Sequence, residues 1–339
     1  MALIGVAVVG AAGWGSNVVR AFSSVRGAAL RWVCDLNGDL LNRVASSYSG
    51  VRVTRSLDDV LADQDVNGVA VAVDAANHHA VARRVLEAGR HVLVEKPLTL
   101  RAADAADLCE LAESKNLTLM VGHLLLYHPA VVRTKAYVSA GDLGDVHYVY
   151  SQRVNLGIVR ENENAWWSLA PHDVAVALHL FDEAPLSISA TGATYLQKDR
   201  GVEDIAFAAL RFPGDRMAHI HVSWLDPHKR RSLTVVGSKR MLTFDDTAAD
   251  ERVKIYDKGA SPRPGHTTYA EGVVIRSGDV VSPALPVREP LVVECEHFVD
   301  CVRNGKRPLS DGRQGLAVVR ILEAGAASIR QGGPPISLT

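Results

Sequence analysis

The chain has 339 residues, a formal net charge of -1 at pH 7, 47% hydrophobic residues and 22% charged residues. This length suggests two domains with a sizeable core, and the composition argues against intrinsic disorder. A nearly neutral chain has no electrostatic reason to bind nucleic acid or an anionic membrane. The apolar start lacks the basic residues and cleavage site of a signal peptide, and no apolar run reaches the ~20 residues that span a bilayer. We expect a cytoplasmic protein with no nucleic-acid or membrane partner.

Short apolar strands alternate with helical patterns through the first third of the chain. The expected strands are Ile4–Val9, Leu30–Cys34, Val51–Val53, Gly68–Val73, His91–Val94 and Leu117–Val121. The expected helices are Asn17–Ser24, Leu40–Ser47, Leu57–Ala62, Ala80–Ala88 and Ala102–Lys115. This alternation predicts an α/β domain with parallel strands joined by right-handed crossovers.

The pattern changes after Gly122, where β-rich segments follow one another without long helices between them. They are Val146–Val154, Leu186–Tyr195, Ile205–Phe212, Ala218–Trp224, Ser232–Gly237, Met241–Asp245 and, more weakly, Val253–Tyr256. This succession predicts an antiparallel sheet. Helices are expected at Pro129–Ala140, Leu291–Arg303 and Gly315–Ile329, and a long surface loop at Asp257–Pro286. We place the domain boundary so that residues 1–122 form the first domain and 123–339 the second.

The four cysteines, Cys34, Cys109, Cys295 and Cys301, contain no Cys-x-x-Cys pair. A chain of this length does not depend on disulfides, so we expect buried free thiols.

A glycine-rich turn follows the first strand. Gly10, Ala12 and Gly15 occupy the three positions of G-x-G-x-x-G, with Gly13 and Trp14 between the last two. A pyrophosphate needs close approach to the backbone there, and the next helix offers free N–H groups and a positive dipole end. The turn between a strand and a helix is therefore a candidate dinucleotide site, with an ordinary βα turn as the alternative.

Asp35 ends the second strand, where a carboxylate accepts hydrogen bonds from the ribose hydroxyls of NAD. The next residue, Leu36, offers no cation for the 2′-phosphate of NADP. These two residues predict NAD as the cofactor.

Glu95-Lys96-Pro97 directly follows the strand His91–Val94. The carboxyl ends of strands line the ligand crevice of a doubly wound sheet, so Lys96 is a candidate active-site residue. A surface ion pair between Glu95 and Lys96 is the alternative.

With VVGAAGWG near its start, Asn77-His78 after the fourth strand and the segment VEKPL, the chain resembles the Gfo/Idh/MocA oxidoreductase family. The resemblance implies a Rossmann domain followed by an α/β domain with a large, mostly antiparallel open sheet that often mediates oligomers. It implies a homodimer or homotetramer. It also implies that Asn77, His78, Glu95 and Lys96 join the glycine loop in binding NAD.

The family's lysine that contacts substrate matches Lys96, and its catalytic histidine, in the motif Asp-x-x-x-His, matches His172. Ser168 stands where many members have the aspartate. The segments GHLLLYHP and RVNLGIVRENENAWWSLAPHDV resemble the subgroup that oxidises nucleotide sugars at C3, with enzymes acting on UDP-N-acetylglucosaminuronate as the best match. The resemblance implies that the sugar binds in the crevice between the two domains.

Polar and aromatic residues near His172 are candidate substrate ligands, because arginine forks suit phosphate or carboxylate and aromatic faces suit sugar or uracil rings. The candidates are Tyr127, Arg153, Asn155, Arg160, Asn164, Trp166 and Trp167. Surface charges and core tryptophans are the alternatives. His219-x-His221 lacks further ligands, so we expect no metal site.

These residues together predict hydride transfer from a secondary alcohol to NAD, which gives a ketone. The hydroxyl needs a base as the hydride leaves. Either His172 is that base and Lys96 stabilises the developing alkoxide, or Lys96 itself is the base. The alternatives in function are an inositol or free-sugar dehydrogenase, a keto-sugar reductase of antibiotic biosynthesis, and a non-catalytic NAD-sensing protein.

Overall fold

The computed structural model describes residues 3–160, 163–262 and 272–339, and the chain forms two compact units. Unit 1 comprises Met1–Tyr127 and Arg288–Arg320, and unit 2 comprises His128–Val287 and Ile321–Thr339.

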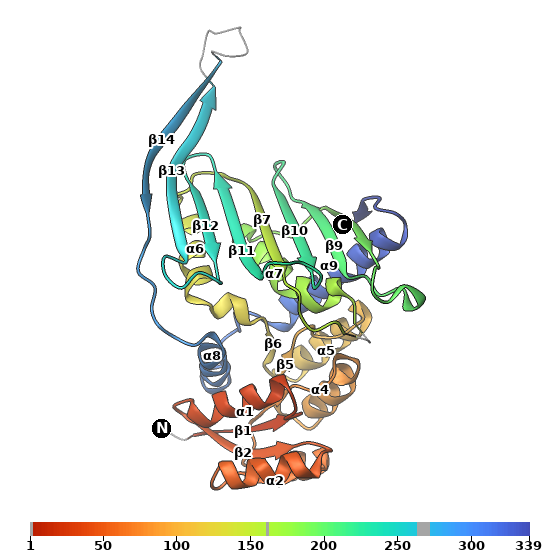
Figure 1. Cartoon of the computed structure of the whole chain (residues 1–339). Coiled ribbons are helices and arrows are strands. Elements are labelled where there is room, and N and C mark those ends of the chain that lie inside the picture. Colours follow the sequence, from red (N-terminus) through yellow and green to blue (C-terminus); the bar gives the residue numbers. More distant parts are fainter. Residues whose placement is uncertain (1–2, 161–162, 263–271) are drawn as a thin grey trace. The chain divides into compact units, whose positions relative to one another are not determined.

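Unit 1 contains a parallel sheet of six strands in the order β3-β2-β1-β4-β5-β6 (Figure 1). The strands are β1 (Ile4–Val9), β2 (Ala28–Cys34), β3 (Arg52–Thr54), β4 (Gly68–Val71), β5 (His91–Glu95) and β6 (Leu119–Gly122). The helices are α1 (Trp14–Ser24), α2 (Gly38–Ser47), α3 (Leu57–Ala62), α4 (His78–Glu87), α5 (Ala102–Ser114) and α8 (Pro290–Asn304). This strand order is that of the Rossmann fold, and it reverses between β1 and β4, where such sheets bind ligands. The predicted α/β class is confirmed.

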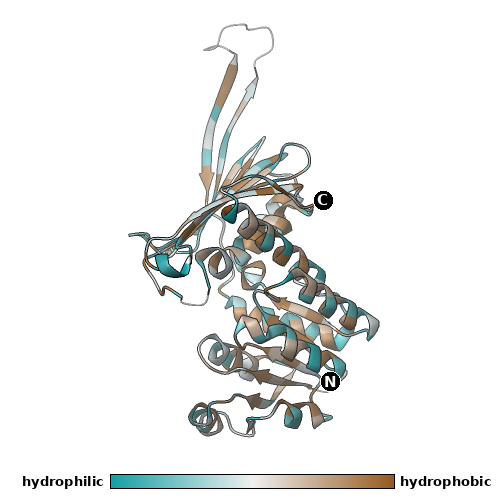
Figure 2. Ribbon diagram, turned by 90° about the vertical axis from the view of Figure 1, so that its right-hand side faces the viewer, coloured by the Kyte–Doolittle hydropathy of each residue, from teal (hydrophilic) through white to brown (hydrophobic). Residues whose placement is uncertain are grey.

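The strands of this sheet are apolar on both faces. All four residues of β4 and all four of β6 are buried, as expected for parallel strands covered by helices on both sides. Figure 2 shows the corresponding hydrophobic colouring along the strands, with hydrophilic residues on the helices. The four cysteines are buried free thiols, as the sequence predicts.

Helix α8 packs in unit 1, although it follows the second sheet in the sequence. The ring of Phe298 on α8 meets Phe22 of α1 edge to face, with centroids 6.2 Å apart. The two units therefore differ from the predicted domains, which are separated by a single boundary after residue 122. The apolar stripe of α8 is visible in the sequence, but its partner helix is not, because a stripe does not specify which surface covers it.

Unit 2 contains a sheet of nine strands among the described residues, in the order β14-β13-β12-β11-β7-β10-β9-β8-β15 (Figure 1). The strands are β7 (Val146–Val154), β8 (Ser187–Ala193), β9 (Ile205–Arg211), β10 (Met217–Ser223), β11 (Arg230–Gly237), β12 (Met241–Asp245), β13 (Val253–Pro262), β14 (Val273–Val281) and β15 (Ile336–Ser337). The pair β7–β10 is parallel and the other pairs are antiparallel, which confirms the predicted, mostly antiparallel sheet.

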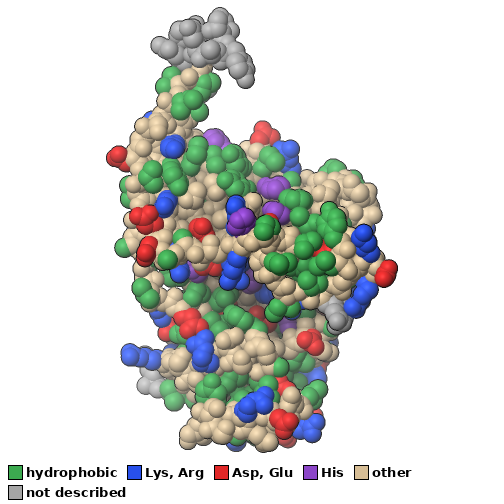
Figure 3. Space-filling model, viewed as in Figure 1, with side chains coloured by type: hydrophobic (Ala, Val, Ile, Leu, Met, Phe, Trp, Pro, Cys, Tyr) green, Lys and Arg blue, Asp and Glu red, His purple; other side chains and the backbone are tan. Residues whose placement is uncertain are grey.

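Helices α6 (Pro129–Ser139) and α7 (Ala165–Phe181) belong to unit 2, and α9 (Gly312–Arg330) passes from unit 1 into unit 2. One face of the sheet is open: Tyr148 and Tyr150 on β7, and Phe207 on β9 on the far side of β10, are each about 40% exposed. Figure 3 shows hydrophobic and histidine side chains gathered over this sheet. Within the described ranges, no helix has the length and apolar character needed to cross a bilayer.

The prediction of a long loop over Asp257–Pro286 is wrong in part. Strand β13 extends to Pro262 and β14 covers Val273–Val281, paired antiparallel to β13. The β-branched residues Val273, Val274, Ile275, Val280 and Val281 favour a strand despite the surrounding Gly, Pro and Ser. Residues 263–271 of the expected loop lie outside the described residues.

Candidate active site

The glycine turn lies at the point where the strand order of unit 1 reverses. Gly10 has φ +87°, and a Cβ on it would lie 2.6 Å from the carbonyl oxygen of Ala72. A Cβ on Gly15 would lie 2.1 Å from the carbonyl oxygen of Gly10, so α1 packs directly on the turn. Gly13, with φ +53°, is the N-cap of α1 and leaves open space where its Cβ would be. Glycine at these positions is therefore required by the backbone.

Helix α1 begins without a side-chain cap and without an acidic residue in its first turn. Its leading N–H groups are therefore not capped by a side chain, as an anion-binding helix terminus requires. The exposed Ala12 precedes Gly13, and its small side chain does not cover the open space. The backbone of this turn fits a pyrophosphate.

Asp35 is held beside the turn by two backbone amides. Its Oδ2 accepts from Ala11 N at 2.7 Å and its Oδ1 from Asn37 N at 2.9 Å. Each carboxylate oxygen retains a lone pair for a ribose hydroxyl. The neighbouring Leu36 is 77% exposed and brings no positive charge. The donor set fits NAD.

A hydrogen-bond chain joins the glycine turn to the end of β5. The indole Nε1 of Trp14 donates to Glu95 Oε1 at 2.7 Å, and Glu95 Oε2 accepts from the Lys96 amide at 3.2 Å. β6 approaches this carboxylate closely, since a Cβ on Gly122 would lie 2.9 Å from Glu95 Oε2. Glu95 thus fixes the backbone of Lys96 relative to the turn.

Two buried ionisable residues near Glu95 and Lys96 were not identified from the sequence. Glu294 on α8 is buried, and its Oε1 has no hydrogen-bond partner among the described residues. Burial and the nearby Glu95 carboxylate raise the pKa of Glu294 well above its usual range. His123 follows β6 and is also buried, and burial together with the Lys96 charge lowers its pKa to about 3. No spacing signal marks either residue, because only the fold brings Glu294 close to Glu95 and His123 close to Lys96.

The next two candidates, Asn77 and His78, stand at the start of α4 but face different surroundings. Asn77 is exposed. His78 is buried, with Nδ1 2.8 Å from the carbonyl oxygen of Pro97 and Nε2 3.0 Å from that of Val73. Burial lowers the pKa of His78. Its ring connects the end of β4 to the segment after Lys96, so both ring nitrogens are engaged within the protein and its contact with cofactor stays a prediction.

In unit 2, His172 lies on α7. Asn164 caps this helix: its Oδ1 accepts from Trp167 N at 2.9 Å, while its Nδ2 donates to Glu203 Oε2 at 2.7 Å. This occupies both polar atoms of Asn164, so the structure does not support its predicted contact with substrate. His172 is half-buried about two turns after Asn164, and the Ser168 that stands where many family members have an aspartate is buried.

Arg153 at the end of β7 pairs with the residue after His172. Its Nε donates to Asp173 Oδ2 at 2.7 Å, and its Nη2 lies 3.4 Å from Oδ1. Both side chains are nearly buried, at 12% and 7% exposure. Arg153 thus lies beside the segment that carries His172, with part of its guanidinium already engaged, and its contact with substrate stays a prediction. Asn155 is half-buried, and the exposed Arg160 pairs with Glu163 at 3.5 Å.

The aromatic candidates divide into two groups. Trp166 is 0% exposed, and its Nε1 donates to the carbonyl oxygen of Leu322 at 2.9 Å. Tyr127 in unit 1 is buried, with its hydroxyl 2.9 Å from Ser310 Oγ. The structure therefore does not support substrate contacts for Trp166 or Tyr127, because both polar groups are used inside the core. Trp167 is half-buried and remains a candidate.

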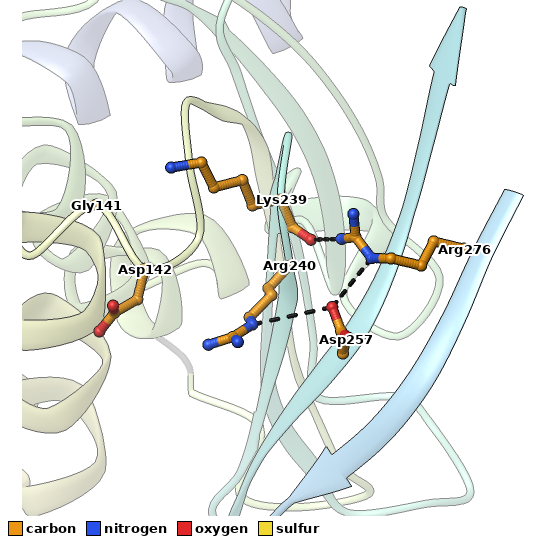
Figure 4. A pocket seen from close by; sticks show the side chains of 6 residues that line it. All are labelled: Gly141, Asp142, Lys239, Arg240, Asp257 and Arg276. Atoms are coloured by element: carbon orange, nitrogen blue, oxygen red, sulfur yellow. Dashed lines mark hydrogen bonds and ion pairs between the residues drawn. The ribbon is translucent and has the colours of Figure 1, made fainter. Parts of the chain in front are cut away.

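The histidine pair of β10 and a surface hollow lie apart from these residues. His221 stacks on Phe207 with centroids 4.3 Å apart, and within the described ranges no three His, Cys, Asp or Glu side chains gather as metal ligands. A hollow of about 440 Å³ lies beyond the end of β11 (Figure 4). It is lined by Gly141, Asp142, Lys239, Arg240, Asp257 and Arg276. None of the predicted site residues lines it.

Comparisons with known proteins agree with this geometry. Residues 4–123 match the oxidoreductase family with an NAD-binding Rossmann fold named GFO_IDH_MocA, and residues 131–243 match the GFO/IDH/MocA C-terminal domain. The chain is 26% identical over 291 residues to UDP-N-acetylglucosamine 3-dehydrogenase of Acidithiobacillus ferrooxidans, which covers 86% of each chain. It is 27% identical to inositol 2-dehydrogenase 1 of Mycolicibacterium vanbaalenii, covering 98% of this chain and 96% of that one.

A solved structure gives the same fold with cofactor bound. GenD2 from gentamicin A biosynthesis, crystallised with NAD, is 25% identical and has a TM-score of 0.82, with coverage of 100% of this chain and 97% of that one. The glycine turn, Asp35 and the two matched domains carry the assignment: the chain belongs to the Gfo/Idh/MocA family of NAD-binding sugar oxidoreductases.

Proposed function

We propose that this enzyme oxidises the C3 hydroxyl of a nucleotide sugar to a ketone, with UDP-N-acetylglucosaminuronate as first candidate and UDP-N-acetylglucosamine or UDP-glucose next. The observation that carries the proposal is the similarity, over 86% of both chains, to UDP-N-acetylglucosamine 3-dehydrogenase. Arg153, which pairs with Asp173, the residue after His172, supports it, because the diphosphate of such a substrate needs positive partners.

The cofactor site is proposed from unit 1. Gly10, Ala12, Gly13, Trp14 and Gly15 would hold the pyrophosphate through the backbone, and Asp35 the adenosine ribose. Exposed Asn77, and Glu95 with Lys96 at the end of β5, would border the nicotinamide. When bound, NAD accepts the hydride that leaves C3.

Lys96 and His172 are proposed to act on the hydroxyl that is oxidised. His172 takes the hydroxyl proton, and the ammonium of Lys96 stabilises the negative charge that develops on oxygen. The converse assignment gives Lys96 the proton-accepting role. Neutral His123, buried beside Lys96, excludes water from that side without adding charge.

Dehydrogenation of an inositol is the second candidate, favoured by the similarity to inositol 2-dehydrogenase 1 over 98% of the chain. The buried Ser168 argues for the first candidate, since it supplies no carboxylate one helical turn before His172. We further propose that the enzyme works in the cytoplasm as a homodimer or homotetramer.

A substrate panel tests the proposal. Purified enzyme with NAD or NADP is mixed with UDP- and dTDP-sugars, myo-inositol and free glucose, and reduced cofactor is followed by its near-ultraviolet absorbance. We expect turnover with NAD and at least one nucleotide sugar. Robust oxidation of inositol or glucose alone would overturn the proposal, and NAD binding without any turnover would favour a sensor.

A further inference from the structure

Two arginines stand side by side in the sheet of unit 2. Strand β11 runs antiparallel to β7, and in their register Arg231 is directly opposite Arg153. Directly opposite residues point to the same face of a sheet, with Cβ atoms about 5 Å apart. Arg153 points to α7, because it pairs with Asp173 there. Arg231 therefore points to the same face of the sheet as Arg153, the face toward Asp173 on α7.

The two arginines differ in how their charge is balanced. Arg153 is nearly buried and held by two hydrogen bonds to Asp173. Arg231 is 47% exposed, and its Nη1 lies 3.8 Å from Asp246 Oδ2, beyond hydrogen-bond distance. Asp246 also pairs with His128 Nε2 at 3.3 Å, and that hydrogen bond is the main reason why its pKa is lowered. The positive charge of Arg231 is thus only partly compensated.

One further cation lies close to Arg231 in the sequence: Lys229, directly before β11, is exposed and forms no ion pair with any of the described residues. Arg230 is also exposed, but it is opposite Val154 in the register and points to the other face of the sheet. Like charges on opposite strands destabilise a sheet, so a cluster of this kind favours an anionic ligand. The guanidinium fork of arginine matches the oxygens of a phosphate, whereas an uncharged polyol offers it no such partner.

We infer that Arg231, next to the Arg153–Asp173 pair, binds the diphosphate of the nucleotide-sugar substrate; this inference rests on the proposed function. Sequence reasoning did not single out Arg231, since only the register of β11 against β7 brings it beside Arg153. It acts as a specificity-determining residue for substrates that carry a nucleoside diphosphate.

The test compares Arg231→Gln with a matched arginine. Arg240 is 48% exposed and has an ion pair of 4.0 Å to Asp257, so it resembles Arg231 in exposure and pairing. It lies just beyond the other end of β11, beside Gly237, which is six residues from Arg231 along the strand, or roughly 20 Å at about 3.3 Å per residue. UDP binding is titrated calorimetrically, and kcat and KM are measured for the nucleotide sugar.

We expect Arg231→Gln to weaken UDP binding and raise KM about 10- to 100-fold, the usual effect of losing a charge-assisted hydrogen bond, with a much smaller change in kcat. Arg231→Lys should recover part of the affinity, and Arg240→Gln should change neither value. NAD binding, measured separately, shows that each variant is folded. If Arg231→Gln binds UDP as the wild type does, or if the wild type binds no UDP, the inference is overturned. Failure of the wild type to oxidise any nucleotide sugar would instead overturn the proposed function.

Discussion

The close packing of Trp166 against Gly325 on α9 allows a direct test of the core packing in unit 2. A Cβ on Gly325 would lie 2.6 Å from Trp166 Cζ2, and the indole is fully buried. Gly→Ala in a helix normally stabilises by about 1 kcal/mol. Here the overpacking costs ~1–3 kcal/mol and outweighs that gain. Gly325→Ala should therefore lower the free energy of unfolding.

The same contact predicts how the substitution behaves when the indole is removed. Trp166→Phe loses the hydrogen bond to Leu322 and leaves a cavity, together about 2–3 kcal/mol. With that space free, Gly325→Ala should stabilise the protein, which gives a coupling energy of ~2 kcal/mol.

Urea denaturation of the four proteins measures this cycle. Additive effects within about 0.5 kcal/mol, or a gain from Gly325→Ala in the wild type, would refute the packing argument. KM for the sugar should be unchanged in Trp166→Phe, because Trp166 is a core residue.

Three further predictions concern the candidate site. Asp35 should make kcat/KM larger with NAD than with NADP, and equal efficiency in steady-state kinetics would contradict this. Lys96→Met and His172→Asn should each lower kcat by ~10²-fold or more while NAD binding, measured by titration, is retained. Glu294→Gln should stabilise the protein increasingly as pH rises above 4.5, the ordinary glutamate pKa. The reason is that the raised pKa of Glu294 lets the folded state keep a proton that the unfolded chain has released, so wild-type stability falls with pH. Urea titrations at pH 5 and pH 8 check this, with the more exposed Glu296→Gln on the same helix as control.

Much of unit 1 could be predicted from the sequence, because its signals are local. The strand Ile4–Val9 and the helix Leu57–Ala62 have the predicted bounds, since an apolar run or a capping Ser56 marks them. The pairing of α8 with α1 could not be predicted, because its apolar stripe fits any helix-covered surface. The antiparallel pair of β13 and β14 was not predicted. The Gly and Ser residues in and around Val273–Val281 indicate a loop, although the β-branched residues there favour a strand.

The residues of the candidate site also divide into those that a local sequence pattern marks and those that only the fold reveals. The positions of Gly10, Asp35 and Lys96 at the ends of strands follow from local patterns, so the sequence alone makes them candidates. Trp166 was a candidate for stacking on a sugar or base, with a core tryptophan as the alternative, and its indole donates a hydrogen bond inside the core. Arg231 needed the strand register, which no local pattern encodes.

The most direct measurement of the central claim is the identity of the product. The enzyme is incubated with NAD and UDP-N-acetylglucosaminuronate, UDP-N-acetylglucosamine or UDP-glucose, and the product is analysed by mass spectrometry and by trapping with an added aminotransferase. The account predicts a 3-keto nucleotide sugar formed in step with reduced NAD from at least one of the three. Oxidation of myo-inositol or free glucose, with every nucleotide sugar recovered unchanged, would contradict it.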